Sequence, residues 1–187
     1  MVTEKRATAV TTVFMVRNIG SGPEVAIQTR NIVTEGYDPE GKDKIEVGPG
    51  ETMRACEYPY DAALRAIQEE WGVPMPKDHV VHIYGGYERD EQNRRITLIT
   101  PPLPIMVNNE YDYPWVSVPV VLHVDGKLEF DEELGDGEAK EGRFMPVQEL
   151  LHWLEKSPQD FFRLTYAGAK ELCRMIIDGK LEVPVHP

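Results

Sequence analysis

The chain has 187 residues, of which 41% are hydrophobic and 28% charged, values that argue against a disordered chain and allow a sizeable buried core. Its formal net charge of −12 argues against a nucleic-acid backbone or an anionic membrane as the main partner, because both would repel it. Two cysteines without CxxC spacing predict unpaired thiols, with neither a disulfide framework nor a thiolate zinc site. Because there is no secretory leader and no run of ~18 apolar residues, we expect a cytoplasmic protein, folded as a single domain over residues 1–187.

Strands are indicated by β-branched and alternating apolar residues bounded by turn residues. The turn 18–23 predicts a hairpin between the first two strands, and four glycines with two prolines predict a long irregular loop over 31–50. Pro119 suggests that the last strand lies at an edge or contains a bulge. The predicted strands are 8–16, 24–29, 44–47, 80–87, 96–100 and 115–124.

Helices are predicted in two regions. Pro59 suits a first helical turn and Gly72 suits the position after the last one, so a helix is expected over about 59–71. Apolar stripes predict C-terminal helices within about 146–178, as two helices over 146–156 and 161–178, after an acidic loop at 129–143. The order of strands, helix, strands and helices lacks regular βαβ alternation. It therefore predicts an α/β fold, an α/β/α sandwich with a mixed central β-sheet.

The helix at 59–71 carries an unusual set of charges. Helical spacing places Arg65, Ala66, Glu69 and Glu70 on one broad strip, which we expect to face away from the core. An ordinary solvated face with an ion pair between Arg65 and Glu69 explains this strip. However, two carboxylates near a helix C-terminus oppose the macrodipole, and a divalent cation would compensate for them.

The segment 50–73 resembles the Nudix box of the Nudix hydrolase family, G-x5-E-x7-R-E-U-x-E-E-x-G-U, where U is bulky and aliphatic. Pro49 and Gly50 match the usual lead-in, and "RFMPVQELL" at 143–151 is similar to the family's segment before its last helix. Two positions depart from the box: Glu51 replaces its first glycine, and Ala66 replaces the glutamate after the arginine. The matching box residues are Glu57, Arg65, Ile67, Glu69, Glu70, Gly72 and Val73.

The resemblance implies a Nudix-like sandwich and metal-dependent hydrolysis of a nucleoside diphosphate linked to another moiety. It implies Mg²⁺ or Mn²⁺ as cofactor, a small nucleotide-type substrate and, since family members often dimerise, a homodimer. In this interpretation the metal ligands are Glu69, Glu70, the Gly50 carbonyl and Glu57, the last as an outer ligand or as the partner of Arg65. The catalytic residues are Arg65, Glu69 and Glu138.

Ala66 leaves two alternatives open. Either Glu51 or an acid of the loop replaces the missing carboxylate, or the chain is a catalytically impaired Nudix-like domain that binds a nucleotide or a protein. The loop acids are Glu132, Glu133, Glu138 and Glu141, with Glu138 favoured. Substrate-binding residues are not assigned. Side chains that could stack on a base or meet a phosphate, but that more often pack or stay solvated, are Tyr37, Tyr84, Tyr87, Tyr111, Tyr113, Trp115, Arg30, Arg89, Arg94 and Arg95. His82, His123 and His152 have no metal-ligand spacing.

Overall fold

A central β-sheet organises the computed structural model, which describes residues 8–31, 41–84, 86–89, 95–99, 103, 106–108 and 115–186. Five strands follow the order β10-β2-β1-β9-β5, and three short strands extend the sheet: β3 beside β2, β4 beside β1 and β8 beside β9. Strand β1 runs parallel to β9, and the other pairs are antiparallel, so the sheet is mixed, as predicted. The strands are β1 (Thr8–Asn18), β2 (Pro23–Arg30), β3 (Ile45–Glu46), β4 (Gly50–Thr52), β5 (Val80–Tyr84), β8 (Met106–Asn108), β9 (Trp115–Val124) and β10 (Ala139–Pro146).

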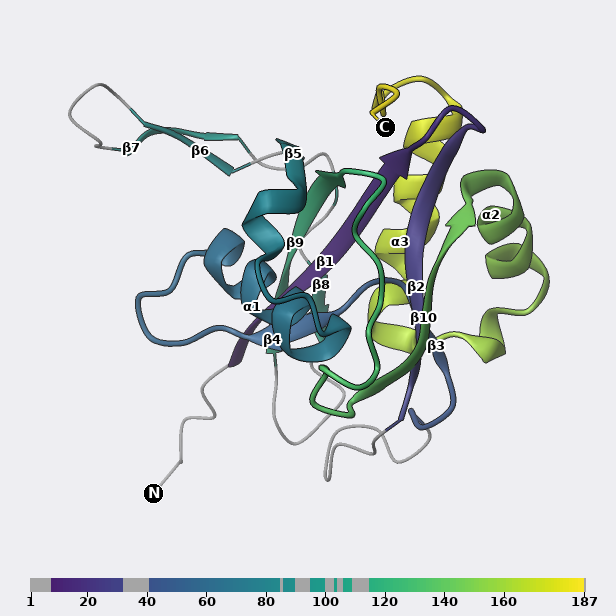
Figure 1. Ribbon diagram of the computed structural model, residues 1–187, viewed down its shortest axis with the longest axis horizontal. Coiled ribbons are helices and arrows are strands. Elements are labelled where there is room, and N and C mark those ends of the chain that lie inside the picture. The colour runs from purple at the N-terminus through teal and green to yellow at the C-terminus, as the bar shows by residue number, and fades with distance from the viewer. Residues whose placement is uncertain are drawn as a thin grey trace.

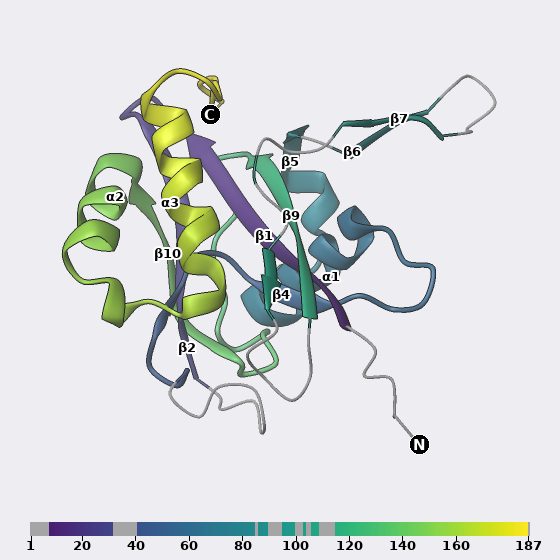
Figure 2. The same cartoon turned by 180° about the vertical axis from the view of Figure 1, so that it is seen from behind.

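Helices cover both faces of this sheet, which confirms the predicted sandwich. Helix α1 (Pro59–Trp71) lies on one face, seen in front in Figure 1, and α2 (Val147–Lys156) and α3 (Arg163–Ile177) belong to the other layer, with α3 in front in Figure 2. Alternating residues of β1 divide the core, because successive side chains of a strand point to opposite faces. Val13 and Met15 pack with α1, whereas Phe14 and Val16 pack with α2 and α3.

The predicted hairpin of β1 and β2 is confirmed, and α1 has the predicted bounds. Gly72 follows α1 with a φ of 67°, a left-handed conformation that glycine adopts without steric cost. The α3 boundaries differ from the prediction by one or two residues, which is the usual uncertainty at helix ends.

Three sequence-based expectations about strands were wrong. The loop predicted over 129–143 ends earlier, because β10 begins at Ala139 and pairs with β2 despite its charged sequence. The segment 80–87 is divided between β5, which pairs with β9, and β6 (Gly86–Arg89), which pairs with β7 (Arg95–Ile99) in a separate two-stranded sheet.

Pro119 lies on neither an edge strand nor a bulge. Strand β9 pairs with β1 on one side along most of its length, with Pro119 opposite Thr12. On its other side, β8 pairs with residues up to Ser117 and β5 pairs from Val121 onward. In the described part of the chain, Pro119 is therefore paired on the β1 side only, and the gap between β8 and β5 on its other side is a place where a missing N–H is tolerated.

The two cysteines are unpaired, as predicted; Cys56 is exposed, and burial raises the pKa of the Cys173 thiol to about 12. Within the described ranges, no helix combines the length and the apolar character that crossing a membrane requires. The predicted single-domain organisation over residues 1–187 stays a prediction.

Candidate functional site

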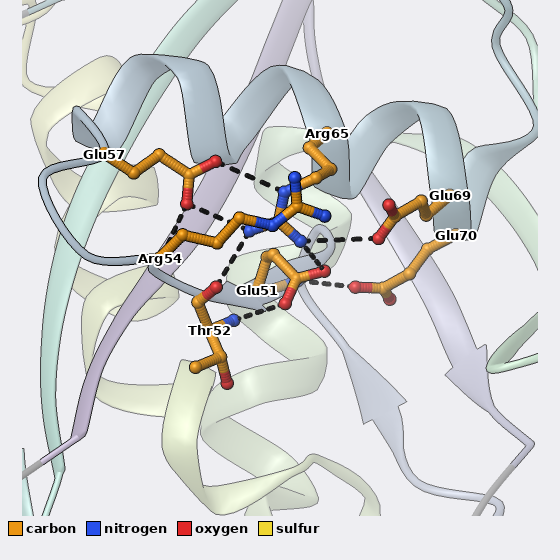
Figure 3. Close-up of polar contacts among 8 residues, drawn as sticks. Glu51, Thr52, Arg54, Glu57, Arg65, Glu69 and Glu70 are labelled. Atoms are coloured by element: carbon orange, nitrogen blue, oxygen red, sulfur yellow. Dashed lines mark hydrogen bonds and ion pairs between the residues drawn. The ribbon is translucent and has the colours of Figure 1, made fainter.

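Arg65, near the middle of α1, connects several acidic residues of the predicted box (Figure 3). Its guanidinium group donates to both carboxylate oxygens of Glu57, at 3.2 and 3.0 Å, and to the Thr52 carbonyl at 2.8 Å. The same group lies 2.6 Å from the Glu51 carboxylate and 3.5 Å from that of Glu69. Hydrogen bonds from Arg65 lower the pKa of Glu57, so this carboxylate stays ionised and holds the loop against the helix.

Glu51 takes the place of the box glycine and points toward α1 (Figure 3). Besides its ion pair with Arg65, its carboxylate accepts a hydrogen bond of 2.6 Å from the Thr52 N–H. Partial burial raises the pKa of Glu69, and the neighbouring Glu51 carboxyl raises it further. Glu51 and Glu69 therefore share one small region with a single guanidinium between them.

Glu70 corrects the expectation that both carboxylates face away from the core. Its side chain is only 6% exposed, whereas Glu69 beside it is 41% exposed. The Gly50 N–H donates to one Glu70 oxygen at 3.0 Å, and the Gln28 amide donates to the other at 2.6 Å. Burial raises the pKa of Glu70 well above its usual range, and the nearby Glu46 carboxyl adds to this shift.

Behind Glu70 lies a polar network that the sequence analysis missed. Gln28 on β2 also donates to Glu46 at 3.3 Å and accepts a hydrogen bond from the Trp71 indole N–H. Arg30, considered above for phosphate binding, lies 3.0 Å from the Glu46 carboxylate, and burial raises the pKa of Glu46 in spite of that partner. The available signal was a glutamine at an inward position of a buried strand, two residues after Ala26.

Ala66 is fully buried and packs in the apolar cluster between α1 and the sheet, together with Ala63 and Ile67. Ala66 lies one turn before Glu70 and is buried with it, so the expectation that this strip faces away from the core was wrong for both residues. A methyl group at this position serves packing and supplies no oxygen to the site. Among the box positions, Glu51 is the additional acid whose carboxylate contacts Arg65.

The acidic loop before β10 docks onto the C-terminal end of α1. The Asp131 and Asp136 N–H groups donate to the carbonyls of Trp71 and Glu69, at 2.9 and 2.7 Å, so the loop caps the helix that carries the box. Glu138, at the end of this loop, contributes to the raised pKa of Glu70, and its own pKa is raised by burial and by Asp136.

The other loop acids differ from Glu138. Glu141 accepts a hydrogen bond from the Thr29 hydroxyl at 3.3 Å and lies at an irregularity of β10, whereas burial, Glu46 and Glu138 together raise the pKa of Glu70. Glu138 is therefore the loop acid that acts electrostatically on the buried carboxylates of the site.

The remaining candidates have other surroundings. Trp115 is buried in β9, and Tyr84 donates from its hydroxyl group to the Glu182 carbonyl, so both serve packing. His123 is buried and stacks on Tyr84, while His82 and His152 are exposed. Tyr37, Tyr111, Tyr113 and Arg94, and the side chains of Tyr87, Arg89 and Arg95, lie outside the described residues.

The chemistry of these donors suits a hard divalent cation. The carboxylates of Glu46, Glu51, Glu57, Glu69, Glu70 and Glu138 outnumber the guanidinium groups of Arg30, Arg54 and Arg65 around them. Mg²⁺ and Mn²⁺ prefer such oxygen ligands. As the side chains are placed, no three acids, histidines or cysteines of the described residues converge closely enough to hold a metal. Glu51 and Glu69 are instead held by Arg65, Glu51 at 2.6 Å and the more exposed Glu69 at 3.5 Å.

Comparisons with known proteins agree with this geometry at the level of the fold. No family model matches the sequence, and no curated protein matches it. Among solved structures, a Nudix hydrolase from Alicyclobacillus acidocaldarius has a TM-score of 0.59 at 12% identity, covering 99% of this chain and 100% of that one. A NUDIX-family hydrolase from Clostridium perfringens has a TM-score of 0.57 at 13% identity, covering 91% and 99%. An Ap4A hydrolase of C. elegans, in a binary complex, has a TM-score of 0.54 at 10% identity, covering 93% and 98%.

These structures share the mixed sheet and its flanking helices with this chain across nearly its whole length. The chain therefore has the Nudix hydrolase fold, as the box at 50–73 implied.

Proposed function

We propose that this chain is a Nudix-type hydrolase that cleaves a nucleoside diphosphate linked to another moiety, with Mg²⁺ or Mn²⁺ as cofactor. The observation that carries the proposal is the arrangement around Arg65, where Glu57 fixes the arginine and Glu51 and Glu69 lie beside it, next to the buried Glu70. The similarity to Nudix hydrolases, one of them an Ap4A hydrolase, supports hydrolysis of a small nucleotide-type compound.

Glu69, Glu70 and the Gly50 carbonyl would hold the metal. Glu57 would support the site without touching the metal, by fixing Arg65 through two hydrogen bonds. Bound there, a divalent cation supplies charge neutralisation for a diphosphate and lowers the pKa of a water molecule. Glu138 is the proposed general base, since a raised carboxyl pKa favours proton uptake from water.

Glu51 is the proposed replacement for the carboxylate that Ala66 lacks. It reaches the same side of α1 from strand β4, and it already shares Arg65 with Glu69. The usual box has glycine at the position of Glu51 and glutamate at the position of Ala66. In this chain the carboxylate is on β4 and the small residue is on α1. If Glu51 acts as that replacement, Glu51→Gln should weaken metal binding and reduce the rate about 10–100-fold, the usual effect of losing a group that supports a metal site.

The test is hydrolysis of a panel of nucleoside diphosphate compounds with Mg²⁺ or Mn²⁺, followed as formation of the nucleoside monophosphate. Wild type should turn over at least one compound, Glu69→Gln should abolish turnover, and Glu149→Gln, an exposed acid of α2, should leave it unchanged. The double variant Glu51→Gly with Ala66→Glu restores the usual box; it should recover activity only if the fully buried position 66 accommodates a carboxylate, which near-UV circular dichroism checks.

The full burial of Ala66 favours a second candidate function, a catalytically impaired domain that binds a nucleotide or a protein. Absence of turnover across the panel, together with a nucleotide-dependent rise in melting temperature, would support nucleotide binding instead. A large gain of activity in Ala66→Glu alone would indicate that Glu51 does not replace the missing carboxylate.

A further inference from the structure

Gln28 is a deeply buried polar side chain near the candidate site. It lies on β2 with 1% of its surface exposed, two residues after Ala26 and therefore on the sheet face that packs against α1. An amide in such a place is costly unless its hydrogen bonds are made. Gln28 makes three: it accepts one from Trp71 and donates to Glu70 and Glu46.

The orientation of this amide follows from its partners. The Trp71 indole N–H can only donate, so the Gln28 oxygen faces Trp71 and its NH₂ group faces the two carboxylates. Trp71 itself is held in the core by edge-to-face contacts with Phe130 and Phe144, at centroid distances of 5.7 and 5.6 Å. The amide donor is thus directed at Glu70 by the last residue of the same helix.

Glu70 is consequently fixed at both oxygens. The Gly50 N–H of β4 bonds Oε1 at 3.0 Å, and the Gln28 Nε2 of β2 bonds Oε2 at 2.6 Å. The two donors come from different strands, while α1 fixes the backbone of Glu70. The carboxylate therefore has its rotamer set before any ligand binds.

A neutral amide suits this task better than a charged group. A lysine or arginine at position 28 would neutralise Glu70 and weaken its attraction for a cation, and a carboxylate would repel it. An amide orients the carboxylate and leaves its negative charge in place. Carboxylates that bind metals are commonly hydrogen-bonded in this manner by residues that do not touch the metal.

We propose that Gln28 is a positioning residue, which aligns the Glu70 carboxylate for a divalent cation and is itself directed by Trp71. This inference rests on the proposed function, in which Glu70 is a metal ligand. Because the effect passes through Glu70, it should be measurable as metal affinity in the absence of substrate.

The experiment is a Mn²⁺ titration followed by the electron paramagnetic resonance signal of free Mn²⁺. Gln28→Met keeps the length of the side chain but removes its donor and acceptor, and the Mn²⁺ Kd should rise about 10–100-fold, as for other residues that support a metal ligand. Gln28→Asn keeps an amide that is one methylene too short, and it should also weaken binding. Near-UV circular dichroism verifies that each variant is folded.

Ser117→Ala is the matched control. Ser117 is equally buried, and its hydroxyl shares a hydrogen bond of 2.6 Å with Thr12, so this variant also loses a buried hydrogen bond of the sheet, away from the carboxylates. It should lower the melting temperature and leave the Mn²⁺ Kd within about threefold of wild type, less than the effect expected of a supporting residue.

The outcomes separate the two proposals. Wild-type affinity in both Gln28 variants, or an equal loss of affinity in Ser117→Ala, would overturn the positioning role while leaving the proposed function intact. If wild type itself binds no Mn²⁺ at millimolar concentration, the metal-dependent function fails, and the role of Gln28 fails with it.

Discussion

Arg65 makes more polar contacts than any other side chain described at the site, and their geometry requires a planar group. It meets Glu57 through two nitrogens, the Thr52 carbonyl through one of them, and Glu51 through the third. A guanidinium group has five N–H donors in a fixed fork, whereas an ammonium group is a point charge. These bonds hold the pKa of Arg65 above its usual value although burial opposes this.

Arg65→Lys should therefore cost both stability and function. We expect a loss of roughly 1–3 kcal/mol, the range for hydrogen bonds to charged groups, because lysine cannot serve Glu57, Glu51 and Thr52 together. Urea denaturation measures the stability, and formation of nucleoside monophosphate measures the accompanying loss of activity.

Arg17→Lys provides the comparison. The Arg17 side chain has nearly the same exposure, 16% against 15%. Among the described acids it pairs with Glu24 alone, at 2.8 Å across the β1–β2 hairpin, and its guanidinium group lies over the Phe144 ring. A single pair of this kind contributes about 0.2–1 kcal/mol. Equal losses in the two variants would mean that the fork geometry of Arg65 has no special importance.

At this scale, the sequence predicted the residues whose spacing is local. Glu57, Arg65, Glu69 and Glu70 all belong to one continuous segment, and the structure brings them together around β4 and α1. Gln28 and Glu46 were missed because their partners are distant in sequence. Gln28 lies 18 residues from Glu46 and 42 from Glu70, and only the folded sheet and helix bring the three together. Helical spacing also failed to show that Glu70 and Ala66 are buried, since two strip positions can differ in exposure.

At the scale of elements, the junction between α1 and the acidic loop is the part of the fold most closely tied to the site. Two features of this junction require glycine at position 72. The φ of 67° favours glycine, and a Cβ atom added there would lie 2.2 Å from the Asp131 carbonyl oxygen. The same loop leads to Glu138, so a shift of the loop moves the proposed base.

Gly72→Ala should destabilise the protein in two ways. Left-handed strain accounts for roughly 1–2 kcal/mol, and displacement of the loop adds about 1–3 kcal/mol as overpacking. Gly179→Ala isolates the first contribution, because Gly179 has a φ of 69° and no atom within 4 Å of an added Cβ. Urea denaturation of both variants gives the difference, and activity should fall only in Gly72→Ala. Equal destabilisation of the two variants would show that the loop moves away from the added Cβ atom at no energetic cost.

Elements marked by residues within their own segment were predicted more accurately than elements that depend on pairing with a distant segment. Helix α1 was located to the residue by Pro59 and Gly72, which act on the backbone directly. Strand β10 was not found, because its sequence "AKEGRFMP" has little strand propensity and forms through pairing with β2. Tertiary pairing of this kind cannot be read from one segment alone.

At the scale of the whole molecule, an acidic chain with a net charge of −12 also buries acidic groups at its candidate site. The pKa values of Glu46, Glu69, Glu70 and Glu138 are all raised, chiefly by burial. A carboxyl group with a raised pKa binds its proton more tightly in the folded protein. Its stabilisation is fully present below the unfolded pKa and is lost as pH rises through the folded pKa.

The opposite sign applies to Glu57 and Asp125, whose pKa values are lowered, Glu57 chiefly by Arg65, and Asp125 by His79 in spite of burial. Their stabilisation is present above their unfolded pKa values and is lost as pH falls through the folded ones. Since the two sets act on either side of the ordinary carboxyl pKa of about 4.5, the metal-free protein should be most stable at mildly acidic pH.

We therefore expect the melting temperature of the metal-free protein to fall as pH rises from about 5 to 8. Glu70→Gln should flatten this fall, because it removes the buried group whose pKa is raised well above its ordinary value. Saturating Mn²⁺ should raise the melting temperature of wild type most at the alkaline end, where the carboxylates are ionised, and should have little effect on Glu70→Gln. Glu149→Gln removes the same charge from the surface of α2 and should keep the wild-type slope; an equally flat profile there would assign the pH dependence to net charge rather than to the buried carboxylates.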